Sequence, residues 1–406
     1  MISILQKAKK QAKENKSFFM IKDFKKYQAQ TSLHPIGLEV SHAQGSYIFD
    51  IYGKAYLDFV AGVSANVIGH RPESVIKAVE EQLHRYMHVM VYGEFVQEPQ
   101  VRLTRKLAQL FPGDLSVTYL VNSGTEATEG AIKLAKHYTG RAEIIAAHNS
   151  YHGNTQGSMS VMDYAERKNP FMPLIPGVRF IGFNNTDEIN KITEKTAAVI
   201  LETIQGGAGF IEPENNFLQK VKKQCEKVGA LLILDEIQTG FARTGKMFGF
   251  EHYHVIPDIV ITGKALGGGM PIGAFTSTPP IMKTLTQPAM GHITTFGGHP
   301  VIAAAALATV NFIEQNNLHQ EALRKEKLFR KHLKHDKIKE IRGRGLMLSL
   351  IMQSPEQANN LILKALDSGL ILFWLLYEKR AVRITPPLTI SDDEIMKGIE
   401  IILSLL

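Results

Sequence analysis

From about residue 72 onward, segments with a helical spacing of apolar residues alternate with short runs that are almost entirely apolar. Apolar side chains recur at helical spacing over residues 73–86, 99–111, 125–138 and 216–228, which predicts amphipathic helices. The short apolar or β-branched runs cover residues 117–121, 143–147, 197–204, 230–234 and 258–262. Runs of this kind predict strands buried on both faces. Their alternation with helices predicts an α/β fold with a mostly parallel sheet.

The two ends of the chain follow a different pattern. The first forty residues are polar and rich in lysine, which predicts a helix that leads into a turn at Pro35–Gly37. Residues 46–50 and 55–59 flank Tyr52-Gly53-Lys54 and predict a β-hairpin. After Pro300, a long helical stretch is followed by strands, a helix, further short strands and a closing helix. This second region predicts a separate, smaller α+β unit.

The composition narrows the class of protein. The chain has 406 residues, more than one hydrophobic core usually holds, with 44% hydrophobic and 21% charged residues. Disorder, collagen and a coiled-coil rod are thereby excluded, and no apolar run reaches the roughly 18–20 residues that cross a bilayer. We see no secretory signal, and the one cysteine, Cys225, excludes an internal disulfide or a cysteine-rich metal cluster. We therefore expect a cytoplasmic protein without a metal site.

The net charge of +7 raises the question of a nucleic-acid partner. Aromatic residues are not interleaved with the lysines as in a stacking platform, so a solvated helix face is the better interpretation. The excess could also favour anionic small molecules. Much of the positive charge lies near the N-terminus, at Lys7, Lys9, Lys10, Lys13, Lys16, Lys22, Lys25 and Lys26.

Two predicted strands end in ionisable residues. The run 230–234 leads into Asp235, and a buried carboxylate at a strand end needs a cation or hydrogen-bond donors. The run 258–262 leads to Lys264, which stands just before the glycines 267–269. A partly desolvated lysine becomes a nucleophile towards carbonyl groups, and glycines let a flat ligand approach the backbone. Taken alone, Asp235 could equally be a helix cap, and Lys264 a solvated charge.

A third segment joins a strand to a helix. The run 117–121 is followed by Asn122, Ser123, Gly124 and Thr125, after which helical spacing begins. Free backbone N–H groups at a helix N-terminus, together with the two hydroxyls, can bind an anion such as a phosphate. An ordinary helix cap explains the same residues.

A fourth segment places Tyr151 and His152 after the run 143–147. The tyrosine ring could stack on a ligand ring, although a buried aromatic beside a satisfied histidine is the simpler reading. Taken together, the four segments provide a phosphate site, a stacking ring, a carboxylate for a pyridinium nitrogen and a lysine for an aldehyde. These are the groups needed to hold pyridoxal 5′-phosphate (PLP).

The same motifs resemble those of the class III, ornithine/acetylornithine-type, PLP-dependent aminotransferases, in the family's order from about Pro35 to Ile390. The resemblance implies the type I fold of PLP enzymes, α/β with a mostly parallel sheet in a large domain and a smaller α+β domain. It implies that residues 1–50 and 306–406 form the small domain and 51–305 the large one. It also implies a homodimer with a shared active site. The motifs are Asn122–Ala127, Tyr151–Gly153, Asp235–Gly240, Gly263–Gly269 and Thr295–Gly298.

The resemblance assigns roles residue by residue. Lys264 matches the lysine that bonds to the cofactor, and Asp235 matches the partner of its ring nitrogen. Arg383, in Val-Arg-Ile-Thr-Pro-Pro-Leu, matches an arginine that binds a substrate carboxylate, a task that suits its guanidinium. The remaining cofactor contacts that it implies are Ser123, Gly124, Thr125, Tyr151, His152, Glu202, Gln238 and, towards the neighbouring subunit's phosphate, Thr295.

One position departs from the family pattern. Glu202–Gly207 resembles the family segment Glu-Pro-Ile/Val-Gln-Gly-Glu, but Gly207 stands in place of the final glutamate. In ornithine- and acetylornithine-type members that glutamate pairs with the carboxylate-binding arginine. The resemblance therefore implies that Arg383 is unmasked, and a small residue here looks more like the amine and ω-amino-acid members.

The resemblance thus implies an aminotransferase that moves an amino group from an amino acid or ω-amine donor to a 2-oxo acid, 2-oxoglutarate or pyruvate, by a ping-pong mechanism. Alternatives are an aminomutase or decarboxylase on the same fold, or an acetylornithine or ornithine aminotransferase proper. A cofactor-binding regulatory protein is disfavoured because no helix-turn-helix-like appendage is present. We expect no nucleic-acid or membrane partner.

Overall fold

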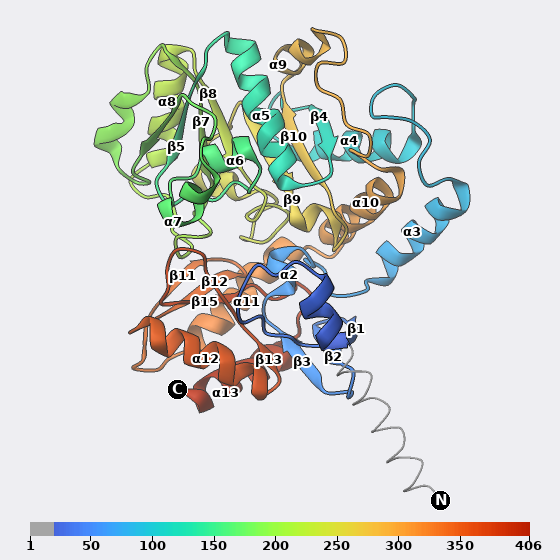
Figure 1. The fold of residues 1–406 in the computed structure, drawn as a ribbon, viewed down its shortest axis with the longest axis vertical. Helices are drawn as coiled ribbons and strands as arrows, with labels where there is room; N and C mark the ends of the chain where they lie inside the picture. Colours follow the sequence, from blue (N-terminus) through green and yellow to red (C-terminus); the bar gives the residue numbers. More distant parts are fainter. Residues whose placement is uncertain (1–19) are drawn as a thin grey trace, which may run out of the picture.

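The computed structural model describes residues 20–406 and is built around a seven-stranded sheet (Figure 1). All its strands run in one direction except β10, which is antiparallel to both of its neighbours. This confirms the α/β prediction with a mostly parallel sheet. In spatial order the strands are β4 (Val117–Val121), β10 (Gly273–Ser277), β9 (Ile259–Gly263), β8 (Leu231–Asp235), β7 (Thr196–Glu202), β5 (Glu143–Ala147) and β6 (Val178–Ile181).

Helices cover both faces of this sheet, which is why its central strands are apolar at successive positions. Within β8, Ile233 packs in the same cluster as Ala131 of α5 (Gly124–Thr139). Leu232 and Leu234 point to the other face and share a cluster with Val221 of α8 (Phe217–Val228). The alternation along one strand therefore anchors the sheet between two helical layers.

The predicted helices over 73–86, 99–111, 125–138 and 216–228 are all present, with ends shifted by one or two residues. Helix α10 packs against α3 and α4 beside the large sheet. Besides α5, α8 and the helical residues 20–27, the described helices that lie before residue 316 are α2 (Ala61–Ser64), α3 (Glu73–Arg85), α4 (Glu98–Leu110), α6 (Gln156–Ser160), α7 (Ala165–Lys168), α9 (Pro279–Lys283) and α10 (Pro300–Gln315). Short 3₁₀ turns are η1 (Asn169–Phe171), η2 (Thr186–Lys191), η3 (Gly249–Tyr253), η4 (Lys264–Gly267) and η5 (Thr284–Thr286).

Two four-stranded sheets lie beside the large one, in the lower half of Figure 1. The predicted hairpin is confirmed as β2 (Tyr47–Asp50) and β3 (Ala55–Asp58), which pair antiparallel. We expected the large domain to begin after residue 50. Strand β3 lies beyond that point, and it pairs in parallel with β13 (Leu370–Ile371) as well as with β2. The two ends of the chain therefore meet in one sheet. The other strands are β1 (Val40–Gln44), β11 (Ile338–Arg344), β12 (Met347–Met352), β14 (Phe373–Trp374) and β15 (Ala381–Ile384).

Three helices complete this smaller α+β unit: α11 (Leu318–His332), α12 (Pro355–Asp367) and α13 (Asp392–Leu405). Strands β6 and β10 were not among the predicted elements, because Val178–Ile181 is short and Gly273–Ser277 follows a glycine-rich loop. In the predicted N-terminal helix, residues 20–27 are helical, and Lys7–Lys16 lie outside the described residues. None of the described helices is long and apolar enough to cross a membrane.

Candidate active site

The carboxyl ends of the parallel strands meet along one edge of the large sheet, where α/β folds bind ligands. Strand β8 ends at Asp235, β7 ends at Glu202, and Lys264 directly follows β9. A cavity of about 410 Å³ opens there. Its lining residues are Val63, Gly124, Thr125, Tyr151, His152, Gly153, Asn154, Glu202, Gly207, Asp235, Ile237, Gln238, Lys264, Phe373, Trp374, Leu376 and Arg383.

Lys264 lies at the cavity in a backbone conformation that few side-chain-bearing residues adopt, with φ of 42°. Burial lowers the pKa of its amino group, because a desolvated ammonium is disfavoured. The carboxylates of Asp235 and Glu202 oppose this shift, and the guanidinium of Arg383 adds to it. A larger fraction of Lys264 is therefore the neutral, nucleophilic amine near neutral pH than for an exposed lysine.

Asp235 is buried and held from two sides. Its Oδ2 lies 2.7 Å from Nδ1 of His152, and its Oδ1 accepts a hydrogen bond of 2.9 Å from the Ile237 backbone N–H. The buried Nε2 of His152 has no hydrogen-bond partner among the described residues. These contacts hold the carboxylate in one orientation at the cavity, as a partner for a ring nitrogen requires.

Glu202 connects two loops at the strand ends. Its Oε1 accepts a 3.0 Å hydrogen bond from the Tyr151 backbone N–H, and its Oε2 accepts one of 2.9 Å from Gly206. Burial raises the pKa of Glu202 to about 7, an effect that nearby Asp235 reinforces and His152 opposes. Through its contact with the Tyr151 backbone, Glu202 fixes the loop that carries Tyr151, whose side chain lines the cavity.

The helix α5 begins at the cavity with a tightly packed N-terminus. A Cβ on Gly124 would lie 2.7 Å from Cδ1 of Ile237, and one on Gly153 would lie 2.4 Å from Oγ1 of Thr125. Thr125 Oγ1 also lies 2.8 Å from Oγ1 of Thr155, which the sequence did not single out. Small residues and hydroxyls at a helix N-terminus form a cradle that suits a phosphate.

Of three further residues predicted to contact the cofactor, one lines the cavity and two do not. Gln238 lines the cavity, and its Nε2 donates a 3.4 Å hydrogen bond to Ser64. Ser123 caps α5, where its hydroxyl accepts a 3.3 Å bond from the Glu126 N–H, and it does not line the cavity. Thr295 is exposed outside the cavity. The roles assigned to these residues stay predictions.

Arg383 enters the cavity from the smaller α+β unit. It lies on β15 opposite Phe373, and its guanidinium sits over the ring of Phe210, 5.5 Å from the centroid. The side chain is buried, and its Nε and Nη1 have no hydrogen-bond partner among the described residues. Burial lowers its pKa to about 10, so it remains a cation at neutral pH. An unpaired buried cation is costly, and a carboxylate would complete its hydrogen bonding.

One wall of the cavity, formed by Phe373, Trp374 and Leu376, was not predicted from the sequence. An indication was present in the apolar run 370–377, which lies a few residues before Arg383. Spacing alone could not show that this run faces the strand ends of the other sheet.

The residues of this chain that surround the cavity fit PLP. It contains a lysine with a lowered pKa, a buried carboxylate whose orientation is fixed, and a helix N-terminus too crowded for a Cβ at two glycines. These are the donor types that an aldehyde, a pyridine nitrogen and a phosphate require.

Comparison with known proteins gives the same class. The aminotransferase class-III family profile matches residues 27–406. The chain is 38% identical to an acetylornithine aminotransferase of Methanopyrus kandleri, over 88% of this chain and 91% of that protein. It is 39% identical to a putrescine aminotransferase of Pectobacterium atrosepticum, over 86% of this chain and 77% of that protein.

Its fold matches the crystal structure of an ornithine aminotransferase from Toxoplasma gondii with a TM-score of 0.89. The two share 30% identity, over 96% of this chain and 94% of the other. The molecule is thus a PLP-dependent aminotransferase with the type I fold. The chain belongs to the class III aminotransferases, which confirms the resemblance stated above.

Proposed function

We propose that this aminotransferase moves an amino group from an amino acid or amine donor to 2-oxoglutarate or pyruvate, with Lys264, Asp235 and Arg383 as its principal site residues. The observation that carries the proposal is that the unpaired guanidinium of Arg383 and the amino group of Lys264 line the same cavity. A 2-oxo acid has a carboxylate for the first group and a carbonyl for the chemistry beside the second.

PLP, when bound, supplies an electron sink for the carbon from which a proton is removed. Within the chain, Lys264 Nζ would hold the cofactor and would serve as the general base for this proton. Asp235 would keep the ring nitrogen protonated, and His152 holds Asp235 in place. Tyr151 would face the ring of the cofactor, and the segment from Ser123 to Thr125 would hold its phosphate.

From the names of the relatives we take only the chemical class of the amino donor. Their names include an acetylornithine and a putrescine aminotransferase, so amino acids and amines are both candidate donors. A ping-pong cycle, with release of the oxo product before the acceptor binds, is the form that we expect.

We further infer a cytoplasmic homodimer in which Thr295 reaches the neighbouring subunit's phosphate. Exposed apolar side chains support this assembly, because patches of this kind mark interaction surfaces. They lie in two segments that are joined by a 3.2 Å hydrogen bond from the Tyr92 N–H to the Thr294 carbonyl. The exposed residues are Met87, Val89, Phe95, Val96, Met290, Ile293 and Phe296.

A donor panel assayed against 2-oxoglutarate and pyruvate tests the activity. Lys264→Ala should abolish turnover and the visible absorbance of the lysine-bound cofactor. The exposed Lys220, on α8, provides the control Lys220→Ala, which should retain both. Full activity in Lys264→Ala would disprove the assignment. Sedimentation tests the dimer, and a fully active, PLP-saturated monomer would contradict it.

A further inference from the structure

One loop carries two of the side chains that are predicted to contact the cofactor. It begins at His148, directly after β5, and ends at Asp163, beyond α6. Tyr151 and His152, near its beginning, line the cavity. Asp163 does not line the cavity, and its side chain belongs to a separate group of polar contacts at the two ends of this loop.

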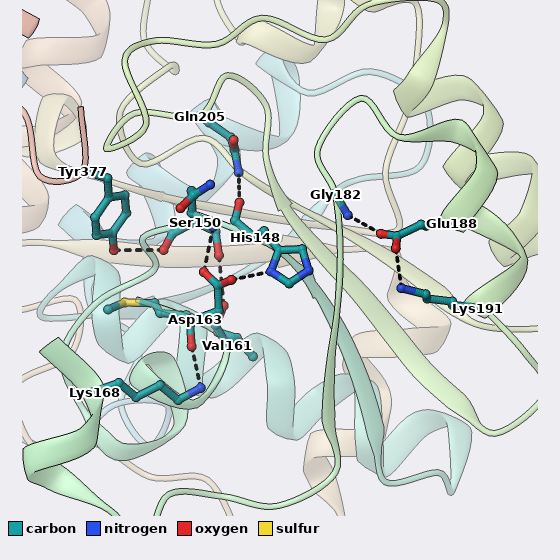
Figure 2. A network of polar contacts seen from close by, with 12 residues as sticks. His148, Ser150, Val161, Asp163, Lys168, Gly182, Glu188, Lys191, Gln205 and Tyr377 are labelled. Carbon is teal, nitrogen blue, oxygen red and sulfur yellow. Dashed lines mark hydrogen bonds and ion pairs between the residues drawn. The ribbon is translucent and has the colours of Figure 1, made fainter. Parts of the chain in front are cut away.

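Asp163 joins the two ends of the loop (Figure 2). Its Oδ1 accepts a 2.7 Å hydrogen bond from the Asn149 N–H, and its Oδ2 contacts Nδ1 of His148. A third link lies next to these two, where the Ser150 hydroxyl donates a 3.0 Å hydrogen bond to the Val161 carbonyl. One carboxylate therefore contacts two consecutive residues at the opposite end and closes the loop at its base.

The contact with Asn149 fixes a turn of the main chain. Asn149 has a φ of 59°, in the left-handed region that few side-chain-bearing residues adopt. A backbone conformation of this kind persists where the surroundings hold it in place. Because the Asp163 carboxylate holds the N–H of this residue, it sets the direction in which the chain leaves β5 towards Tyr151.

The first end of the loop is also attached to two other parts of the chain. Gln205, which follows β7, donates a 2.7 Å hydrogen bond from Nε2 to the His148 carbonyl. Tyr377, between β14 and β15 of the smaller unit, donates one of 3.1 Å from its hydroxyl to the Ser150 carbonyl (Figure 2). The main chain just before Tyr151 is therefore held from the large sheet and from the smaller unit.

The other end of the loop is held by Lys168. Its Nζ donates hydrogen bonds of 3.1 Å to the Ser160 carbonyl and 2.5 Å to the Met162 carbonyl. Burial lowers the pKa of the Lys168 amino group, and the negative charge of Asp163 opposes this effect. Asp163 thus lies where two anchored ends of the loop meet.

These contacts restrict the loop whether or not the cavity is occupied. They leave Tyr151 at the cavity, and they leave His152 with its Nδ1 2.7 Å from Oδ2 of Asp235. Ordering a flexible loop on binding costs conformational free energy, so a loop that is already closed binds its ligand more tightly.

We propose that Asp163 is a positioning residue for PLP: it closes the loop of residues 148–163 and thereby holds Tyr151 and His152 at the cavity. The inference rests on the roles proposed for these two residues. It goes beyond the proposed function, because it concerns how the cofactor site is held and applies to every amino donor.

Asp163→Ala tests the proposal through cofactor affinity. The variant removes both contacts of the carboxylate, so the PLP dissociation constant should rise roughly 5- to 50-fold, as expected for the loss of one or two hydrogen bonds to a charged group. Absorbance titration of PLP into the cofactor-free enzyme measures this constant. At saturating PLP, kcat should return close to that of the unsubstituted enzyme, since the occupied site then holds the loop. An unchanged dissociation constant would overturn the proposal.

Asp50→Ala is the matched control. Oδ1 of Asp50 accepts 2.9 Å hydrogen bonds from the N–H groups of Tyr52 and Lys54, in the turn between β2 and β3 and away from the cavity. This variant should lower the temperature of thermal unfolding and leave the PLP dissociation constant within about twofold. An equal rise of the constant in Asp50→Ala and Asp163→Ala would mean that general loss of stability, and not loop closure, weakens PLP binding.

Two milder variants separate the contacts of Asp163. Asp163→Asn removes the charge but keeps an oxygen for the Asn149 N–H, so it should recover much of the affinity lost in Asp163→Ala. No recovery would contradict closure through this N–H. His148→Phe removes the other contact and keeps a ring beside Phe180. It should raise the dissociation constant severalfold even if Asp163→Ala does not fold, and an unchanged value would overturn the proposal.

Hydrogen exchange in the cofactor-free enzyme tests the loop directly. The amides of residues 149–152 should exchange at least about fivefold faster in Asp163→Ala than in the unsubstituted enzyme, and Asp50→Ala should not change them. Equal exchange in all three proteins would overturn the proposal. Since neither PLP binding nor exchange requires amino transfer, an enzyme inactive with every donor would contradict the proposed function alone.

Discussion

The ring of Tyr377 occupies the space into which a side chain at position 207 would extend. A Cβ on Gly207 would lie 2.8 Å from Cε2 and 2.9 Å from Cδ2 of Tyr377, closer than such atoms approach in proteins. The Tyr377 N–H also donates to the Gly207 carbonyl at 2.9 Å. Glycine is therefore required here by a specific neighbour, which gives a physical reason for the departure from the family motif.

We expect Gly207→Glu to act in two ways. Its Cβ displaces Tyr377 and destabilises the fold by about 1–3 kcal/mol, as overpacking does. Its carboxylate competes for Arg383 and lowers kcat/KM for dicarboxylic partners while sparing ω-amine donors. Gly207→Ala is the control, because it has the same Cβ without the charge. Thermal unfolding and donor kinetics separate the two effects, and identical kinetics in both variants would exclude pairing with Arg383.

Arg383→Ala should weaken the oxo-acid half-reaction strongly. Loss of a bidentate, charge-assisted contact costs about 2–4 kcal/mol, or roughly 30- to 1000-fold in kcat/KM. A simple amine donor should lose much less, because it has no carboxylate for the guanidinium. Arg380, which pairs with Glu378 at 2.7 Å, provides the control Arg380→Ala. Equal losses for both substrates in Arg383→Ala would mean that Arg383 is structural.

The lowered pKa of Lys264 predicts opposite pH shifts in two variants. Asp235 stabilises the ammonium and Arg383 destabilises it. In the cofactor-free enzyme, acylation of Lys264 should rise with pH as the amine is released. Asp235→Asn should move the midpoint of this rise to lower pH, and Arg383→Ala should move it to higher pH. Peptide mass spectrometry measures the rate of Lys264 acylation at each pH. A shift in the same direction in both variants would contradict this electrostatic account.

Glu236 is predicted to stabilise the loops that follow β8. It is fully buried, and it accepts hydrogen bonds from the hydroxyls of Thr203 and Thr239 and the N–H groups of Gly249 and Phe250. Glu236→Gln places an N–H donor against other donors, so it should lower the free energy of unfolding by about 1–3 kcal/mol.

Denaturant unfolding of Glu236→Gln is compared with Glu400→Gln, which removes the charge of an exposed carboxylate on α13. The control should remain within about 0.5 kcal/mol of the unsubstituted enzyme. Equal stability of the two variants would show that the four hydrogen bonds do not depend on an anionic acceptor.

Local sequence was sufficient for much of the fold. The apolar spacing predicted α3, α4, α5 and α8 closely, because amphipathic periodicity depends only on which face of a helix is buried. It did not predict β10, whose five residues are buried through pairing with β9 and with β4, a strand about 150 residues earlier in the sequence.

For the site, the sequence by itself determined which chemistry-bearing residues follow which strands. Asp235 and Lys264 could be placed at one sheet edge because parallel strands end together. Only the tertiary structure decided that Arg383, on another sheet, lines the cavity with two nitrogen atoms that lack hydrogen-bond partners, and that Tyr377 excludes a side chain at Gly207. Those relationships depend on how separate sheets pack, and packing between distant segments is set by the whole buried surface rather than by any local pattern.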